Sequence, residues 1–168
     1  MVKTSNVLAG WMAAVLLAAA SQGAIAVETG QKPPTFSLPG DAGTTSLDDF
    51  AGKVVYVDFW ASWCGPCRQS FPWLNEMQKQ FGAKGLVVVG VNVDKKREEA
   101  QKFLADTPAQ FTISYDPQGK TPRDWQVMGM PSSFLVGRDG KVRLVHAGFR
   151  EADRPELEAQ IKAALEQK

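Results

Sequence analysis

The segment from Lys53 to Trp60 most constrains the fold of this chain, because it is a continuous run of β-branched and aromatic residues, KVVYVDFW. Such a run, with the turn residues Ala51 and Gly52 before it, is typical of a strand buried on both faces. Soon after it, apolar side chains recur at helical spacing from Pro66 to Phe81. A buried strand that is followed at once by a helix is typical of an α/β protein with parallel strands.

The rest of the chain continues this alternation. The further predicted elements are, in chain order, a strand over Leu86–Val93, a helix from Asp94 to about Ala105, a short strand over Phe111–Tyr115, one or two helical turns over Pro122–Val127, strands over 133–136 and 142–145, and a final helix. Asp94 is expected to cap its helix, and Asp153 with Glu156 is expected to open the last one. The dipeptide Asp139-Gly140 is a hairpin signal, which adds an antiparallel edge to the parallel strands.

The first 26 residues have the pattern of a secretory signal peptide. Lys3 supplies a positive charge, the run Val7–Ala20 is apolar except for Gly10, and Ala24-Ile25-Ala26 matches an A-x-A cleavage site. A membrane anchor is the alternative, but the run is shorter than the about 20 residues that span a bilayer. We therefore expect cleavage after Ala26, a periplasmic location, and one domain over 27–168.

Composition limits the kind of partner. The net charge is +1, which argues against nucleic acid or an anionic membrane as the main partner.

The segment Val27–Asp49 is rich in Gly, Pro, Thr and Asp and predicts an extended lead-in or a hairpin. His146 is the only histidine and, lying on a predicted strand, is expected to be structural.

The chain holds two cysteines, Cys64 and Cys67, three positions apart. A structural disulfide between them would close almost no loop and would therefore stabilise little. A zinc site needs about four N or S ligands, and the chain offers two Cys and one His. A c-type haem needs a His after the second Cys, where Arg68 stands instead. We therefore expect neither a metal nor another cofactor, and a redox pair is favoured over these alternatives.

The position of the pair suits that chemistry. Cys64 would lie at the N-terminus of the helix, where unpaired N–H groups and the helix dipole stabilise a thiolate. Cys67, one turn further on, could attack a mixed disulfide formed at Cys64. Pro66 suits a first helical turn, and Gly65 leaves Cys64 uncovered for the backbone of a partner.

The segment from Val57 to Arg68, VDFWASWCGPCR, resembles the active-site segment of thioredoxins. The wider pattern resembles the TlpA/ResA-like exported branch of that superfamily, through the lead-in PPTFSLPGDAGTTSLDDFAGK, an extra strand and helix, and the segment VMGMPSSFLV over 127–136. This resemblance covers essentially all of the mature chain. It implies a thioredoxin fold: an α/β domain with a central mixed sheet, helices on both faces, an N-terminal extended or hairpin extension and an inserted strand–helix.

The resemblance also implies roles for single residues. Pro131 matches the cis-proline that faces the cysteine pair and aligns a client backbone, and Met130 before it would contact the client. Asp58 matches the buried aspartate behind Cys67 that acts as a proton acceptor, although solvation at a strand edge is an alternative reading of such a carboxyl. Pro72 matches the proline that kinks the active-site helix. The residues expected to bind the substrate are Trp63, Gly65, Pro66, Met130 and Pro131, with Trp63 packed beside the redox pair.

Two positions depart from the family pattern. Thioredoxins carry a Lys near the aspartate in the second strand, where this chain has Gly90. ResA-like and cytochrome-maturation proteins often carry a Glu near the cis-proline, where this chain has Ser132 and Ser133. The serines weaken an assignment to cytochrome c maturation.

The leading functional hypothesis is a reductase of protein disulfides, since the Gly-Pro dipeptide resembles that of reducing thioredoxins, with potentials of about −270 mV. An oxidase or isomerase of the same fold and a non-catalytic binding module are the alternatives. The expected partners are client proteins with disulfides or thiols and an upstream membrane thiol reductant. Neither nucleic acid nor stable membrane insertion after cleavage is expected, and the protein is expected to be a monomer.

Overall fold

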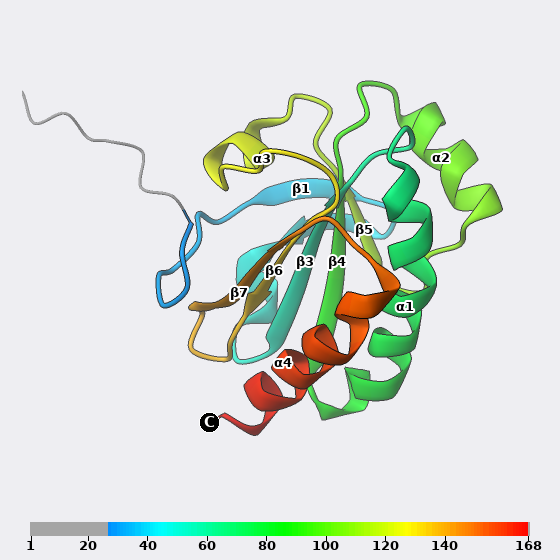
Figure 1. Cartoon of the computed structure of the whole chain (residues 1–168). Coiled ribbons are helices and arrows are strands. Elements are labelled where there is room, and N and C mark those ends of the chain that lie inside the picture. The colour runs from blue at the N-terminus through cyan, green and yellow to red at the C-terminus, as the bar shows by residue number, and fades with distance from the viewer. Residues whose placement is uncertain (1–26, 168) are drawn as a thin grey trace, which may run out of the picture.

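The computed structural model of this chain describes residues 27–167, so the predicted leader lies outside the described residues. The strands are β1 (Ser37–Gly40), β2 (Gly43–Ser46), β3 (Val54–Trp60), β4 (Leu86–Asn92), β5 (Thr112–Tyr115), β6 (Ser132–Val136) and β7 (Val142–Ala147). The helices are α1 (Gly65–Phe81), α2 (Arg97–Asp106), α3 (Lys120–Asp124) and α4 (Arg154–Glu166). Figure 1 shows their arrangement around one sheet.

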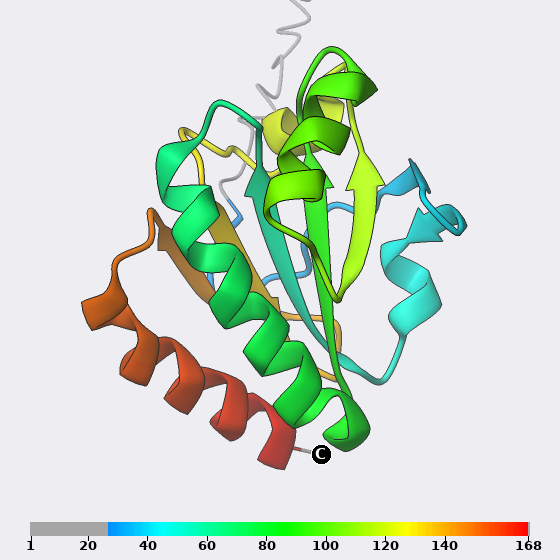
Figure 2. The same cartoon turned by 90° about the vertical axis from the view of Figure 1, so that its right-hand side faces the viewer.

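The strands form one mixed sheet in the order β2-β1-β5-β4-β3-β6-β7. The pairs β3–β4 and β4–β5 are parallel, whereas β6 and β7 extend the sheet as antiparallel strands. Helices α1, α2 and α4 pack on one face (Figure 2), and α3 leads to Trp125 in the core of the other face. The predicted thioredoxin fold, with helices on both faces of a mixed sheet, is confirmed.

Strand β3 lies inside this sheet, between β4 and β6, and all seven of its residues are buried. Its side chains alternate between the two faces, as the pleat of a strand requires. Tyr56 and Trp60 belong to the core under α1, whereas Val57 and Phe59 belong to the core on the opposite face. Asp58 therefore points to the α1 side from the middle of an apolar strand.

Two aromatic clusters fix the carboxyl end of β3. On the α1 side, the ring centroids of Trp60, Phe71 and Phe103 lie 4.8–5.0 Å apart. On the other side, Phe59 packs on Trp125 and Phe134 with centroids 5.6 and 5.8 Å away. Each such pair stabilises the fold by about 0.5–1.5 kcal/mol beyond what the burial of the rings contributes. The loop that carries the cysteines thus leaves the sheet from a rigid point.

The lead-in forms the predicted hairpin, β1 and β2, and joins the edge of β5 through the pair Gly40 and Ser114. The predicted strands and helices are all present, with bounds that differ by a few residues. Within residues 27–167, no helix combines the length and the apolar character needed to cross a membrane.

Two predicted helix caps are wrong, although Asp153 does lie where the last helix begins. Helix α2 begins at Arg97 after Lys96, and the carboxylate of Asp94 does not cap it. Asp153 does precede α4, but its side chain makes no capping bond to that helix and no capping box with Glu156 is present. Its carboxylate instead accepts hydrogen bonds from the backbone N–H and the guanidinium of Arg150. In both cases a tertiary partner or a neighbouring turn binds the carboxylate that a local pattern would assign to the helix.

Candidate active site

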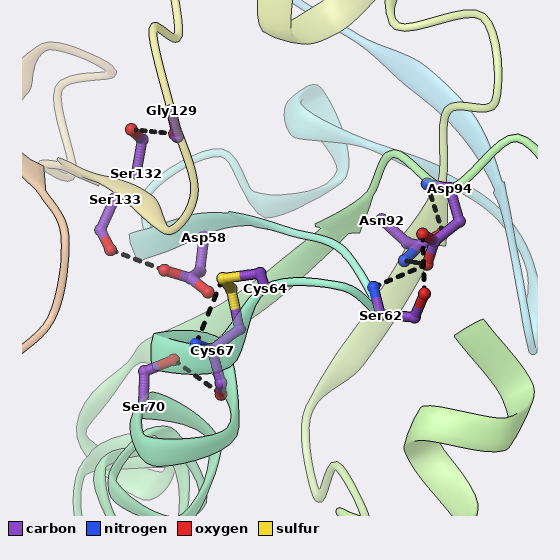
Figure 3. Close-up of a disulfide and its surroundings, with 10 residues drawn as sticks. All are labelled: Asp58, Ser62, Cys64, Cys67, Ser70, Asn92, Asp94, Gly129, Ser132 and Ser133. Atoms are coloured by element: carbon purple, nitrogen blue, oxygen red, sulfur yellow. Dashed lines mark hydrogen bonds between the residues drawn. A yellow bond between two sulfur atoms is a disulfide. The ribbon is translucent and has the colours of Figure 1, made fainter. Parts of the chain in front are cut away.

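Cys64 and Cys67 form a disulfide at the start of α1 (Figure 3), with their Cα atoms 5.4 Å apart. Cys64 is the residue before the first helical turn, and its Sγ accepts a hydrogen bond of 3.2 Å from the Cys67 N–H. Pro66 lies in the first turn, as predicted. In the reduced protein this N–H and the positive end of the helix would both stabilise a Cys64 thiolate.

The exposure of the site differs from the expectation in two respects. Cys64 is only 4% exposed and Cys67 is fully buried, so little of Cys64 is uncovered in the disulfide form. Trp63 is 70% exposed, so most of its indole faces solvent and little of it is packed against other residues. Since Gly65 and Pro66 are also exposed, the residues around the disulfide present an accessible surface.

The Met130–Pro131 peptide bond is cis, as predicted. Pro131 is buried, and its carbonyl oxygen accepts a hydrogen bond of 2.8 Å from the Gly148 N–H. Met130 is half-buried and packs against the cores of both faces. The Ser132 hydroxyl donates to the Gly129 carbonyl oxygen at 2.7 Å, so the loop is bonded both to itself and to the segment after β7.

Asp58 is buried, with 1% of its surface exposed, which confirms the predicted burial. It lies opposite Ser133 of β6 and Gly90 of β4 in the sheet register. Its Oδ1 accepts a hydrogen bond of 2.6 Å from the Ser133 hydroxyl, whereas its Oδ2 has no partner among the described residues. Figure 3 shows the carboxyl group between Ser133 and the cysteine pair.

Burial raises the pKa of Asp58 to about 7, and the hydrogen bond from Ser133 opposes this rise. The cause is desolvation, which disfavours the charged form of a carboxyl. Burial also raises the pKa of Tyr56, the next residue on this face of β3, so that Tyr56 stays neutral. The carboxyl group therefore titrates near neutral pH.

The core explains why β4 has glycine opposite Asp58. A Cβ atom at Gly90 would lie 3.0 Å from Ile113 Cδ1 and Phe111 Cε2, and 3.1 Å from Trp60 Nε1. These contacts are tighter than a well-packed core accommodates without shifts. The space in which the resemblance would place a lysine is therefore filled by hydrocarbon and indole atoms, and the carboxyl has no cation beside it at this position.

The structure adds Asp94, whose carboxylate is buried at the end of β4. Its Oδ2 accepts hydrogen bonds from the Ser62 N–H at 2.9 Å and from the Asn92 amide at 2.8 Å, and its Oδ1 accepts one from the Ser62 hydroxyl at 3.0 Å. Asp94 thus binds the turn that precedes Trp63 and Cys64 (Figure 3). A signal was present in the sequence: polar residues at the carboxyl ends of neighbouring parallel strands share one edge of the sheet.

Comparison with known proteins agrees with this geometry. The family model described as Redoxin matches residues 28–161. The chain belongs to the Redoxin family. Among curated relatives of this Redoxin-family chain, the thiol-disulfide oxidoreductase ResA of Bacillus thuringiensis subsp. konkukian (strain 97-27) is 30% identical over 137 residues, which cover 81% of this chain and 78% of the relative. The thioredoxin-like protein YneN of Bacillus subtilis (strain 168) is 37% identical over 128 residues, which cover 74% of each chain.

Solved structures show the same relationship. A crystal structure described as a thiol:disulfide interchange protein DsbE from Chlorobium tepidum has a TM-score of 0.82 and 58% sequence identity, and the match covers 83% of this chain and 99% of that one. The TlpA/ResA-like resemblance is confirmed. With its Cys64–Cys67 pair in a thioredoxin fold, this Redoxin-family chain is a thiol–disulfide oxidoreductase.

The raised pKa predicts how stability depends on pH. The folded state binds the Asp58 proton more tightly than the unfolded state does. The stability that this difference adds to the folded state is fully present below the unfolded pKa of about 3.9, and it is lost as pH rises through about 7. Asp58→Asn, which keeps an acceptor for Ser133, should remove this loss. At pH 8 the variant should be more stable than the wild type by roughly 4 kcal/mol, measured by urea unfolding from pH 4 to pH 8.

The matched control is Asp106→Asn at an exposed position in the last turn of α2. This variant should keep the pH dependence of the wild type. An unfolding free energy of Asp58→Asn that falls with pH as steeply as that of the wild type would show that the buried carboxyl is not the cause.

The Asp94 network predicts a second effect. Asp94→Ala leaves the Ser62 N–H and the Asn92 amide without their acceptor, and an unsatisfied buried donor costs about 1–3 kcal/mol. We expect a loss of about 2 kcal/mol or more in urea unfolding, together with faster hydrogen exchange at the Ser62 amide. Asp106→Ala, at the exposed position, should change stability by less than about 0.5 kcal/mol; equal losses in the two variants would contradict a role for the network.

Proposed function

We propose that this protein is an exported reductase of protein disulfides. The observation that carries the proposal is the Asp58 carboxyl group, buried beside the cysteine pair with one oxygen that has no hydrogen-bond partner within residues 27–167. Oxidants of this chemistry stabilise the reduced form of their cysteines, which raises the potential. An acidic group, with a glycine where a lysine would lie, does the opposite, because a negative charge disfavours a nearby thiolate.

The proposed reaction begins at Cys64. Its thiolate, formed at the start of α1, attacks a client disulfide and releases one client thiolate, leaving a mixed disulfide between Cys64 and the client. Cys67 then transfers its proton to Oδ2 of Asp58 and attacks Sγ of Cys64. The second client thiolate leaves, and the Cys64–Cys67 disulfide of the present structure forms. The client disulfide is reduced by two electrons, which come from the two cysteines.

Asp58 is suited to the proton transfer because its pKa of about 7 lies close to the working pH. A general base is most effective when its pKa is near that pH. Cys67 is fully buried, so water cannot take its proton directly in this conformation. The Oδ2 atom of Asp58 is therefore the acceptor that we assign to this step.

Clients are proposed to bind over the exposed surface next to the disulfide. Trp63, Gly65 and Pro66 present their surface to solvent, and Met130 is partly accessible. By the family resemblance, a client backbone would align along the segment at Pro131 as an extra strand. A large exposed indole beside the pair supplies apolar contact area at low entropic cost.

The reduction potential separates the reductase from an oxidase. It can be measured by equilibrating the protein with dithiothreitol or glutathione buffers and quantifying the reduced fraction. We expect a value near −270 mV, as in thioredoxin, whereas a value near −120 mV would identify an oxidant. The rate of insulin reduction by dithiothreitol should rise with the wild type and not with Cys64→Ser. A wild type no more active than Cys64→Ser would instead indicate a binding module.

We further propose a periplasmic location, with the leader cleaved after Ala26, an upstream membrane thiol as the reductant, and a monomer as the working form. The charged start, apolar run and A-x-A site of residues 1–26 support export. A reductant is required because each turnover leaves the pair oxidised. A membrane thiol protein could supply electrons across the bilayer to such a compartment.

Cleavage is tested by the intact mass of the protein recovered after export. We expect a chain that starts at Val27, because signal peptidases require small residues such as Ala24 and Ala26 at the cleavage site. An Ala26→Arg variant is the control and should keep its leader. Recovery of only a full-length, membrane-bound species from the wild type would rule out the proposed processing.

A further inference from the structure

Ser133 is the hydrogen-bond partner of the Asp58 carboxyl group, and the family resemblance assigns it no role. It is buried in β6 and lies opposite Asp58 in the antiparallel register of β3 and β6. Its hydroxyl donates to Oδ1 of Asp58 at 2.6 Å. Residues paired in register point to the same face of a sheet, so the contact follows from strand pairing and does not require an unusual side-chain conformation.

The contact leaves the two carboxyl oxygens in different situations. Oδ1 is engaged by Ser133, whereas Oδ2 has no partner among the described residues and is the oxygen left for the cysteine pair (Figure 3). We propose that Ser133 is a positioning residue for thiol–disulfide exchange, whose hydroxyl holds Oδ1 so that Oδ2 is presented to Cys67. This proposal rests on the proton-acceptor role of Asp58 proposed above.

The other groups around Asp58 do not hold its Oδ1 atom in this way. On β3, Tyr56 is the next side chain on the same face and contributes a repulsive charge only if ionised, which its burial prevents by raising its pKa. On β4, Gly90 has no side chain. On the α1 side, the group drawn beside the carboxyl is the cysteine pair, joined as a disulfide (Figure 3).

The next strand supplies one further titratable group. His146 of β7 lies opposite Ser133 in the register, and its Nε2 is 3.5 Å from Oδ2 of Asp153. That carboxylate is also bound by Arg150. The Asp153 carboxylate is thus paired with Arg150, and β6, which carries Ser133, lies between β7 and the strand of Asp58.

The Ser133 hydroxyl also acts on the protonation of Asp58. A hydrogen bond donated to a carboxylate favours its charged form, so Ser133 works against the rise in pKa that burial causes. Without it, the carboxyl group would hold its proton to higher pH and would be a weaker acceptor at neutral pH. Ser133 thus keeps the buried acid in the range where it can both accept and release a proton.

The test compares the two neighbouring buried serines. Ser133→Ala removes the donor to Asp58, whereas Ser132→Ala removes a hydroxyl that donates to the Gly129 carbonyl oxygen. The Asp58 carboxyl is titrated by 13C NMR in the reduced protein. We expect Ser133→Ala to raise the midpoint by about one pH unit and Ser132→Ala to leave it in place. Ser133→Thr, which retains a hydroxyl, should have the wild-type midpoint. Ser133→Gly, a second variant without the hydroxyl, should raise the midpoint as Ser133→Ala does.

A kinetic readout separates positioning from a purely structural role. The rate at which Cys67 resolves a preformed mixed disulfide at Cys64 is measured against pH. Ser133→Ala should move the midpoint of this profile upward by the same amount as in the NMR titration. If the midpoint rises by about one pH unit, the rate below it should fall about tenfold, because the ionised fraction of Asp58 falls by that factor. In the Asp58→Asn background, Ser133→Ala should have no further effect on the profile.

The outcomes distinguish the two proposals. An Asp58 midpoint that does not move in Ser133→Ala and Ser133→Gly would overturn the role of Ser133 and leave the role of Asp58 standing. Resolution by Asp58→Asn at the wild-type rate would overturn the proton-acceptor role, and with it the catalytic effect of Ser133, even if the NMR midpoint moves. An equal rise of the midpoint in both readouts supports the proposal.

Discussion

The site depends on the burial of β3 on both faces. Its backbone is paired on one side by β4 and on the other by β6, and its side chains lie between two aromatic cores. A carboxyl group placed in the middle of such a strand cannot reach water, and desolvation alone raises its pKa. The same cores hold the end of the strand, from which the chain turns through Cys64 into α1. One packing arrangement thus sets both the acid and the position of the thiol pair.

Sheet topology brings the other parts of the site to the same place. Parallel strands β3 and β4 end at one edge of the sheet, where the Ser62 turn meets the Asp94 carboxylate. Strand β6 runs in the opposite direction, so its first residues, which follow the cis-proline, begin at that edge. Segments far apart in the chain are therefore joined by buried or part-buried hydrogen bonds, and such bonds are costly to break because their donors would be left unsatisfied.

Much of this arrangement could be predicted from local pattern. The burial of Asp58 followed from the apolar residues on either side of it, and the helix start at Cys64 from the periodicity after Pro66. The rest depends on tertiary contacts that have no local signal. Trp63 points to solvent while Trp60, at the end of β3, fills the core beneath α1. The partner of Asp94 lies 32 residues away, and the contact of Ser133 with Asp58 requires the register of two strands 75 residues apart.

The glycine opposite Asp58 bears on how the protein responds to its surroundings. Dissolved salt weakens interactions between charges, with a screening length of about 8 Å at physiological ionic strength, but it changes the cost of desolvation little. An acid tuned by a charged group that water and ions can reach would change its titration between dilute and saline media. Here hydrocarbon and indole atoms fill that space around Gly90, and burial is the main cause of the raised pKa. The titration of Asp58 should therefore depend little on the salt content of the medium around the protein.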